Sequence, residues 1–571
     1  MPPFAAQQSL FRAYDIRGSH TLFTPHFIEA LGSAFARLYM ASAHHQKNTH
    51  PEHPVIVIGY DVRCGSDRIA QGLGDMLTHH GIQVIQLGLI TTPMMAFWAQ
   101  QYQGHGIVVT ASHSAKDILG IKWLVAYKSP DSRQIQSLYQ QLIITEAKSR
   151  LHIQTGRPAR YTPSQTIGSA VSRPTLNLAY DHVATAYLDA IAQVFAQIYP
   201  SDKQADHRLS DKLDLVVVID CMHGATSTIA QRLFERFCRH VIMLNDTPDG
   251  RFPTGNPDPT EPYRLRQLQQ SVLAHHADVG MAFDGDGDRL MMVDNNGKVV
   301  SSDHLLYLLA QVALAECPKS LVDSPSTPQV LFDIKCSHHL PILLSQLGST
   351  PVISKTGSSF MRQRMQRADS PIVFAGELSG HFIFNDSHFI IYDDAMYAAL
   401  RLLHWLSAID GKHALTKITQ RLPAIVSTAD HYLPMPDTAE QACPVVEQLA
   451  RLCHHLYQIG AATSESASDH YPLNTAAPSL CACATDSHHL TLEQARQLLP
   501  AGTRLSCIDG VRLDFAHGFG VLRQSNTSHS LTARFAGNTL ADLQDIQAKF
   551  AALCRPFDPQ LAAQITAMPA E

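Results

Sequence analysis

The sequence predicts an α/β protein of several domains whose sheets are mostly parallel. Strand-like apolar runs alternate with amphipathic helical patterns, which favours parallel sheets covered by helices on both faces. The alternation stops in polar stretches and then begins again, so three rounds of it follow one another. A chain of 571 residues is also longer than one hydrophobic core supports. We therefore expect three αβ domains, followed by a small C-terminal α+β domain.

The first round covers about the first 150 residues. Gly81 marks the end of its second helix, and Pro93 follows the Thr91-Thr92 pair that begins the third. The expected elements are a helix over 27–39, a strand over 55–58, a helix over 66–80, a strand over 84–87, a helix from 91 and a strand over 106–109.

The strand over 106–109 ends in the polar loop Thr110-Ala111-Ser112-His113-Ser114. Open α/β sheets usually carry their chemistry in loops at the carboxyl ends of the strands. A serine in such a loop can carry a phosphoryl group or attack an acyl carbon, and these residues alone do not separate the two. A serine hydrolase is disfavoured because no Gly-x-Ser-x-Gly turn surrounds Ser112.

A polar segment over 154–174 is the expected linker to the second round. That round has strands over 215–220, 241–244 and 277–283, with a rigid Pro- and Gly-containing loop over 248–259. The last strand runs into Asp284-Gly-Asp286-Gly-Asp288-Arg289. Alternate carboxylates separated by glycines can converge on one hard cation. An EF-hand is excluded, because Arg289 and Asn295 stand where that loop needs Gly and a bidentate Glu.

The third round and the C-terminal region contain two further polar turns. Gly376-Glu377-Leu378-Ser379-Gly380-His381 offers groups that hydrogen-bond sugar hydroxyls, and Arg523-Gln-Ser525-Asn526-Thr527-Ser528 could cradle a phosphate. Either motif alone could equally be an ordinary turn. The expected elements are strands over 330–335, 351–354 and 372–375, a helix over 393–406, a long loop or insertion over 460–487, strands over 504–508, 520–523 and 531–535, and a helix over 540–553.

Composition limits the partners and the compartment. A formal net charge of −6 gives no electrostatic reason to expect nucleic acid or an anionic membrane, and no apolar run is long enough to span a membrane. The eleven cysteines are odd in number and scattered, which fits reduced thiols. Cys481 and Cys483 lie near His488 and His489, but no second ligand pair has zinc spacing. We expect a cytoplasmic protein, either a monomer or a weak dimer.

Taken together, these motifs resemble the α-D-phosphohexomutase superfamily, and the resemblance covers nearly the whole chain. It is strongest to the bacterial phosphomannomutase/phosphoglucomutase branch of these isomerases. The segments that carry it are FRAYDIRG at 11–18, TASH at 110–113, FDGDGDR at 283–289, DIKC at 333–336, KTG at 355–357, GELSGH at 376–381 and RQSNT at 523–527. It implies three similar mixed-sheet αβ domains and a C-terminal α+β domain around a central active-site cleft, with domains at 1–160, 175–298, 299–422 and 423–571.

The resemblance also implies a mechanism and the residues that perform it. Ser112 would be a phosphoserine, with Mg²⁺ held by Asp284, Asp286, Asp288 and a serine phosphate oxygen. The enzyme would interconvert hexose 1-phosphate and hexose 6-phosphate of mannose, glucose or both, through a 1,6-bisphosphate, with glucose 1,6-bisphosphate as activator. The implied catalytic residues are Ser112, His113, Arg17, Lys122 and Arg289, and the implied substrate-binding residues are Tyr14, Lys335, Ser358, Glu377, Ser379, His381, Arg523, Ser525, Asn526 and Thr527.

Several positions depart from the superfamily pattern. Ser114, Ala115 and Leu119 replace Asn, Pro and Asn around the serine loop, from which we expect altered loop rigidity rather than lost chemistry. Ser358 replaces a histidine, and loss of one positioned acid or base can cost about 10²–10⁴ in rate. A sugar-phosphate-binding homologue with weakened catalysis therefore stays an alternative. A phosphoglucosamine mutase is another, although Leu378 stands where that branch usually has Gln.

Overall fold

The computed structural model describes residues 4–45, 54–154, 174–199, 212–316, 327–409, 413–434, 445–458, 463–464, 497–525, 530–556 and 558–570. The chain divides into two compact units, each built from two segments. Unit 1 comprises Met1–Gln329 and Ser358–Gln420, and unit 2 comprises Val330–Gly357 and Arg421–Glu571.

The first sheet of unit 1 contains the serine loop. Its strand order is β1-β5-β4-β2-β3-β6, and β2 is parallel to both β3 and β4. The sheet is mixed, because β5 runs antiparallel to both β1 and β4. Its strands are β1 Ile16–Ser19, β2 Val55–Tyr60, β3 Gln83–Leu89, β4 Gly106–Val109, β5 Ile118–Leu124 and β6 Leu176–Asn177.

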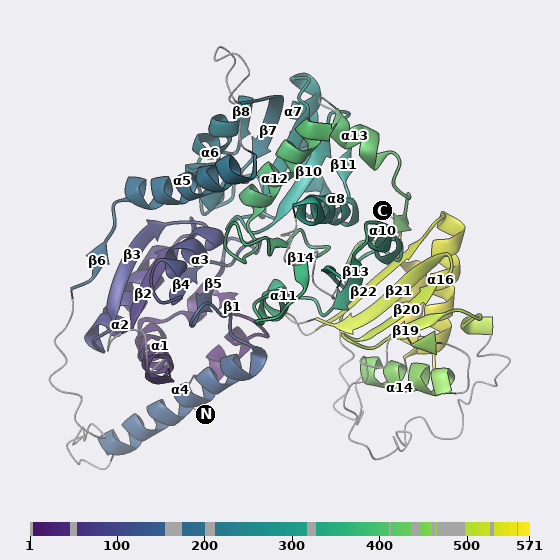
Figure 1. Ribbon diagram of the computed structural model, residues 1–571. Coiled ribbons are helices and arrows are strands. Elements are labelled where there is room, and N and C mark those ends of the chain that lie inside the picture. The colour runs from purple at the N-terminus through teal and green to yellow at the C-terminus, as the bar shows by residue number, and fades with distance from the viewer. Residues whose placement is uncertain are drawn as a thin grey trace. The chain divides into compact units, whose positions relative to one another are not determined.

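Helices cover this sheet on both faces (Figure 1). Alternate strand residues such as Ile56 and Ile58 join one apolar core with the side chains of α1 (Pro25–His45), α2 (Ser66–His79) and α4 (Ser132–Gln154). The shorter α3, Thr92–Gln100, packs against β2 and β4. Thr91 caps α3 by accepting a hydrogen bond from the Met94 amide, and Pro93 lies in its first turn, as the sequence predicts.

The second sheet of unit 1 has the order β11-β10-β9-β7-β8 and contains the Asp loop. β7 is parallel to β8 and β9, whereas β9 and β10 form an antiparallel hairpin with Phe283 opposite Leu290. This register places Asp284–Arg289 in the connection between two fully buried strands. The elements are α5 Tyr180–Ile198, β7 Leu213–Asp220, α6 Ala230–Phe237, β8 Cys238–Leu244, α7 Arg266–Ala274, β9 Val279–Phe283, β10 Leu290–Asp294 and β11 Val299–Val300.

Unit 1 is completed by part of the third αβ segment. Here β14 and β15 form an antiparallel hairpin, with Gly376 opposite Phe382, so that the motif over 376–381 is the turn between them. The elements are α8 Ser302–Ala315, α11 Ser358–Met365, β14 Ile372–Gly376, β15 Phe382–Phe384, α12 Ala395–Ile409 and α13 Ala414–Thr419.

Unit 2 contains β12, α10 and β13 of the same segment, together with the C-terminal sheet. That sheet has the order β16-β22-β21-β20-β19-β18, with β17 also paired to β22. Helix α16 begins in a capping box, in which Thr539 and Asp542 satisfy each other's backbone amides. The elements are β12 Gln329–Asp333, α10 Leu340–Gln346, β13 Thr350–Ser354, β16 Val426–Ser427, β17 His431–Pro434, α14 Val445–Gln458, β18 Thr463–Ser464, β19 Arg504–Ser506, β20 Val511–Phe515, β21 Gly518–Gln524, β22 Ser530–Gly537, α16 Leu540–Cys554 and α17 Pro559–Ala567.

The predicted α/β class is confirmed, and the first two sheets are mixed rather than mostly parallel. Strands β1, β5 and β10 were not predicted from the sequence pattern. They pair antiparallel with their neighbours, so the strand-helix-strand pattern used for the prediction does not reveal them. The expected loop over 460–487 is wrong at Thr463–Ser464, which form β18, and most of its other residues lie outside the described ones. Most of the expected linker over 154–174 also lies outside them.

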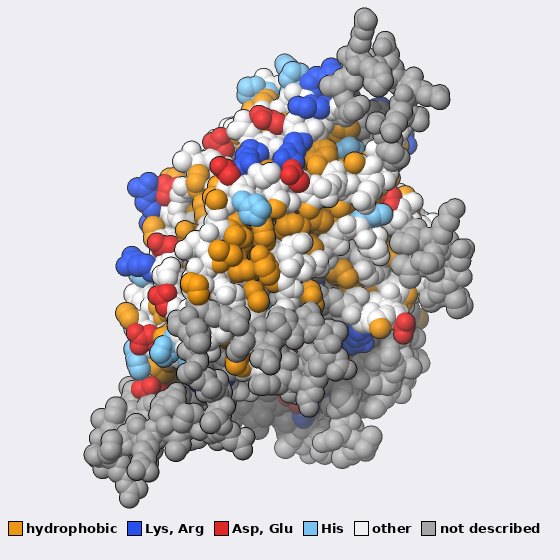
Figure 2. Space-filling view, turned by 60° about the vertical axis from the view of Figure 1, so that its left-hand side comes forward, with side chains coloured by type: hydrophobic (Ala, Val, Ile, Leu, Met, Phe, Trp, Pro, Cys, Tyr) orange, Lys and Arg blue, Asp and Glu red, His pale blue; other side chains and the backbone are white. Residues whose placement is uncertain are grey.

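The surface carries one visible apolar group. Figure 2 shows hydrophobic side chains gathered near the middle of one face, with Lys, Arg, Asp and Glu side chains around them. Among the described residues, no helix is both long and apolar enough to cross a bilayer.

Candidate active site

The serine loop begins where β4 ends and holds its backbone in an unusual conformation. Ser112 has a φ of 51°, which is uncommon for any residue other than glycine. Its amide donates to Thr110 Oγ1 at 2.9 Å, and its own hydroxyl donates to Asp284 Oδ2 at 2.6 Å. His113 Nδ1 lies 3.2 Å from the same Oγ. The loop therefore presents a buried hydroxyl to the Asp loop of the neighbouring sheet.

The Asp loop curls around one of its own carboxylates. Asp284 Oδ1 accepts hydrogen bonds from the backbone amides of Gly287, Asp288 and Arg289 at 3.0–3.1 Å. Gly287 has a φ of 80°, a conformation that a side chain would strain. These bonds bring the carboxylates of Asp284, Asp286 and Asp288 together, with one oxygen of each within 4.8 Å of the others.

The cluster has the chemistry of a cation site. All three aspartates are at least 98% buried, and Asp286 Oδ1 and Asp288 Oδ1 have no hydrogen-bond partner among the described residues. Buried carboxylate oxygens without a donor are the ligands that a hard divalent cation prefers. Burial, followed by repulsion from Asp288 and Asp286, holds the pKa of Asp284 well above its usual range. A bound cation would relieve this repulsion, so the residues fit a metal ion.

Lys122 on β5 compensates part of the negative charge. Its Nζ lies 2.7 Å from Asp286 Oδ2 and 2.6 Å from Asp288 Oδ2. Burial lowers its pKa, but the two carboxylates outweigh burial and leave the pKa raised. Lys122 is therefore a fixed positive charge beside the cluster.

Two arginines connect the serine loop with the rest of unit 1. Arg17 on β1 donates to the Ala111 carbonyl at 3.1 Å and to Ser114 Oγ at 3.2 Å. Arg289 Nη2 lies 3.5 Å from His113 Nε2. Burial, and then the nearby arginines, hold the pKa of His113 well below its usual value, so its imidazole is neutral at pH 7.

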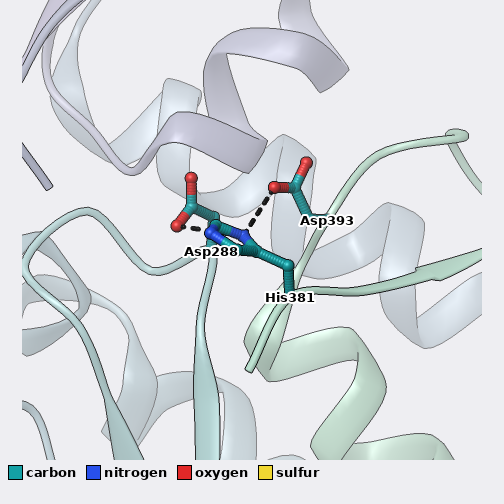
Figure 3. Close-up of side chains that lie close together, drawn as sticks. All are labelled: Asp288, His381 and Asp393. Carbon is teal, nitrogen blue, oxygen red and sulfur yellow. Dashed lines mark ion pairs between the residues drawn. The ribbon is translucent and has the colours of Figure 1, made fainter. Parts of the chain in front are cut away.

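A second ionic group surrounds His381, at the end of the turn between β14 and β15. Figure 3 shows its ring between the carboxylates of Asp288 and Asp393, and His381 Nδ1 lies 2.8 Å from Asp393 Oδ2 and 3.6 Å from Asp288 Oδ1. Arg289 Nε donates to His381 Nε2 at 3.2 Å, and Arg362 pairs with Asp393. Burial lowers the pKa of His381, but the two carboxylates outweigh burial and raise it.

The other predicted unit 1 residues lie in the same third segment or at β1. Ser379 Oγ donates to Glu377 Oε2 at 3.2 Å, and Glu377 is 2% exposed. Ser358, which begins α11, accepts a hydrogen bond from Arg362 Nη1 at 3.1 Å. Tyr14 is half-buried, with its ring edge-on to Phe360.

Unit 2 contains a separate group of buried cations. Lys335 pairs with Asp430, and Arg523 Nε donates to Asp509 Oδ2 at 2.9 Å. Arg523 is 4% exposed, and its Nη2 has no hydrogen-bond partner among the described residues. Ser525 follows β21 and is held by a backbone bond from its amide to the Ser530 carbonyl. The predicted residues Asn526 and Thr527 lie outside the described residues.

Sequence models of the phosphoglucomutase/phosphomannomutase family match three successive parts of the chain. Its alpha/beta/alpha domain I matches residues 8–148, domain II matches 185–297 and domain III matches 301–425. The chain belongs to the α-D-phosphohexomutase superfamily. The predicted resemblance is thereby confirmed.

Individual members of the superfamily align with this chain over nearly its whole length. A phosphomannomutase/phosphoglucomutase of Pseudomonas syringae pv. tomato is 29% identical over 97% of this chain and 96% of that protein. A phosphoglucomutase of Neisseria gonorrhoeae is 26% identical, with 96% of each chain covered. The crystal structure of a phosphoglucomutase/phosphomannomutase family protein from Burkholderia thailandensis is 25% identical and superimposes with a TM-score of 0.69 over 99% of both chains.

Most of the predicted site residues in unit 1 contact one another. Ser112, His113, Arg17, Lys122, Arg289 and the three aspartates form one connected group, and His381 joins it through Arg289 and Asp288. Lys335, Arg523 and Ser525 belong to unit 2. Sequence reasoning missed Asp393, Arg362 and Arg63 as parts of the site. Asp393 and Asp394 precede α12, and acidic residues are common before helices because they stabilise the helix dipole. The sequence therefore does not distinguish a helix-stabilising aspartate from a site residue here.

Proposed function

We propose that this phosphohexomutase interconverts hexose 1-phosphate and hexose 6-phosphate of glucose, mannose or both, through a phosphorylated Ser112 and a hexose 1,6-bisphosphate. The observation that carries the proposal is the contact of 2.6 Å between Ser112 Oγ and Asp284 Oδ2. It places a buried hydroxyl at the edge of a carboxylate cluster that fits a divalent cation. Phosphoryl transfer needs such positioning and charge neutralisation more than covalent assistance from the protein.

Mg²⁺ is the proposed cation, held by Asp284, Asp286, Asp288 and an oxygen of the serine phosphate. A hard cation with all-oxygen ligands, when bound, would neutralise charge on the transferring phosphoryl group. Lys122 lies beside the same carboxylates and supplies a permanent positive charge. Glucose 1,6-bisphosphate is the proposed activator, because it can phosphorylate Ser112 in an enzyme that has lost its phosphate.

The proposed first step transfers the phosphoryl group from Ser112 to a hexose 1-phosphate. The bond between phosphorus and the sugar 6-oxygen forms, and the bond between phosphorus and Ser112 Oγ breaks. The proton of the 6-hydroxyl leaves the sugar and ends on Ser112 Oγ, so atoms and charge balance. The neutral ring of His113, 3.2 Å from Ser112 Oγ, is placed to hold that proton. Transfer of the 1-phosphate to Ser112, after the bisphosphate has turned over, releases hexose 6-phosphate.

The remaining residues have proposed roles in binding. Arg17 and Arg289 support the transferring phosphoryl group, and Glu377 and Ser379 hold the sugar hydroxyls shared by both orientations. Further proposed substrate contacts come from Tyr14, Ser358 and His381 in unit 1. In unit 2, Arg523 with Ser525, Asn526 and Thr527 would grip the phosphate that is not transferred, and Lys335 would contact the substrate.

The proposal extends to the state of the enzyme in the cell. We propose a cytoplasmic monomer or weak dimer that needs neither nucleic acid nor a membrane, which its net charge of −6 supports. Light scattering during gel filtration measures the mass of the particle, to be compared with 62.8 kDa for one chain.

The test is a ³¹P NMR assay with glucose 1-phosphate or mannose 1-phosphate, Mg²⁺ and catalytic glucose 1,6-bisphosphate. We expect the 6-phosphate signal to grow with at least one sugar, and Ser112→Ala to abolish it. Ser9→Ala, at an exposed position, is the matched control and should behave as wild type. Binding of the sugar phosphates without turnover by the wild-type chain would instead support a non-catalytic homologue, and turnover of glucosamine phosphate alone would support that branch.

A further inference from the structure

The loop from Pro248 to Pro259 has no role in the proposed mechanism, yet it lies between the serine loop and the Asp loop. Near its start, the backbone of Gly250 lies directly against the residues that follow β2. A Cβ added to Gly250 would lie 2.2 Å from the Val62 carbonyl oxygen and 2.7 Å from Arg63 Cα. This contact is therefore between two backbones, with no space for a side chain.

Arg63, at this contact, is hydrogen-bonded to the serine loop at four points. Its Nη2 donates to the carbonyls of Ser112 at 2.6 Å and Ser114 at 2.5 Å. Its Nη1 donates to the carbonyls of Ala115 at 2.6 Å and Ile118 at 3.1 Å. The planar guanidinium thus holds the loop at and beyond the reactive serine, which the single ammonium of a lysine cannot reproduce.

Phe252 covers the guanidinium from the other side. Arg63 Cζ lies 4.9 Å from the centre of the Phe252 ring, in the range of a cation–π contact. Arg63 is 2% exposed and Phe252 is 5% exposed, and Asp61 supplies the neighbouring carboxylate. The loop over 248–259 therefore keeps water away from the hydrogen bonds that hold the serine loop.

The far end of the same loop reaches the Asp loop. The Gly285 amide donates to the Pro257 carbonyl at 3.2 Å, and Asp258 lies 3.6 Å from Arg289 Nη1. A Cβ on Gly285 would meet the Ser112 carbonyl oxygen at 2.5 Å and the Pro257 ring at 2.9 Å. One short segment thus contacts both Arg63, which holds the serine loop, and the metal loop.

We propose that Arg63 is a positioning residue which, capped by Phe252, sets Ser112 Oγ against the Asp284–Asp288 cluster. The inference rests on the proposed mutase function. It explains how the serine loop is held although Ser114 and Ala115 replace the Asn and Pro of the superfamily. Four hydrogen bonds to one guanidinium hold the loop, and Arg63 acts through carbonyls without touching the reacting atoms.

Arg63→Lys tests this role, because it keeps the charge but not the four-point contact. We expect kcat to fall roughly 100-fold, since a misplacement of about 1 Å at a reacting group can have that effect. KM for the hexose phosphate should stay within about twofold, because the substrate contacts are not altered. Phe252→Leu should show a smaller fall in kcat, and Arg68→Lys, an exposed arginine of the next helix, should show none.

A second variant separates positioning from a general loss of structure. In Arg63→Ala, millimolar guanidinium added to the assay should restore part of kcat, while the same concentration should leave the wild type and Arg68→Lys unchanged. A merely structural role would not produce this rescue. Wild-type kcat in Arg63→Lys, or no rescue of Arg63→Ala, would overturn the inference.

Hydrogen exchange keeps this inference distinct from the proposed function. Amides of the segment 110–120 should exchange at least about tenfold faster in Arg63→Lys than in wild type, while those of α16 stay unchanged. If the wild-type chain turned over no sugar phosphate but this local change appeared, the proposed function would fail and the positioning role would stand. Unchanged exchange in 110–120 would contradict the positioning role, whatever the activity.

Discussion

The charged groups of unit 1 and unit 2 are built in opposite ways. In unit 1, two of the three buried carboxylates, Asp286 and Asp288, share Lys122, and Oδ1 of each has no donor among the described residues. In unit 2, Lys335 pairs with Asp430 and Arg523 pairs with Asp509, and Arg523 keeps one donor, Nη2, without a hydrogen-bond partner among the described residues. An excess of acceptors suits a cation, whereas a spare guanidinium donor suits a phosphate. These atoms are the basis of the cation site proposed in unit 1 and of the phosphate contact proposed for Arg523 in unit 2.

The largest effect should come from removing one acceptor of the unit 1 cluster. Asp286→Asn keeps the volume but removes a charge, so bound Mg²⁺ and the transferring phosphoryl group lose a stabilising partner. We expect kcat to fall roughly 10²–10³-fold and half-saturation to need more Mg²⁺. Steady-state rates against Mg²⁺ concentration measure both, with Asp75→Asn, an exposed carboxylate on α2, as control. Equal changes of kcat and of Mg²⁺ dependence in Asp286→Asn and Asp75→Asn would contradict a cation site at the buried carboxylates of unit 1.

The unit 2 site should respond to loss of its spare donor. In Arg523→Gln the guanidinium is gone, and a charge-assisted hydrogen bond is worth about 1.5–3 kcal/mol. KM for the hexose phosphate should therefore rise roughly ten- to a hundredfold, with a smaller change in kcat. Arg555→Gln, at an exposed position, is the control for loss of a positive charge. A fall in kcat with an unchanged KM would place Arg523 in the chemical step instead.

Mg²⁺ should stabilise the protein more at high pH than at low pH. The raised pKa of Asp284, caused by burial and by its two neighbours, means that the folded metal-free protein binds this proton more tightly than the unfolded chain. The metal-free protein therefore loses stability as the pH rises above the ordinary carboxyl pKa and through the raised pKa of Asp284. A bound cation compensates the charge of ionised Asp284 and so removes this loss of stability. At about 100 times its Kd, Mg²⁺ adds about 2.7 kcal/mol. Thermal melts at pH 5 and pH 8 test this, and a larger shift at pH 5 would contradict it.

The last effect concerns a unit 1 carboxylate outside the cation cluster. Asp394 accepts a hydrogen bond from Tyr187, and burial raises its pKa from 3.8 to about 6. This contribution to stability is complete below pH 3.8 and is lost as the pH rises through 6, a change of about 3 kcal/mol. In Asp394→Asn the stability should vary less with pH between 4 and 7. Denaturant titrations at several pH values measure it, and an unchanged pH profile would show that burial alone does not govern this carboxylate.

The site residues in sequence motifs were predictable, whereas their supporting residues were not. Ser112 and the aspartates stand in polar loops directly after apolar strands, a pattern visible in one dimension. Arg63 was not predicted, because nothing in its local sequence shows that its side chain reaches carbonyls 49–55 residues away. Asp393 and Arg362 were missed for the same reason, since Asp393 contacts Arg362 and His381, which stand elsewhere in the sequence.

The sequence by itself determined the α/β class, the strand-loop placement of the chemistry and the membership of the superfamily. Periodic burial, turn residues and alternating carboxylates are local properties, so they can be read along the chain. Only the tertiary structure decided which strands pair antiparallel, that Lys122 reaches Asp286 and Asp288, and that the loop over 248–259 lies against Arg63. Those outcomes depend on strand pairing and on contacts between segments that are distant in the sequence. The free energy of burying a charge likewise depends on whether an opposite charge from another segment lies beside it.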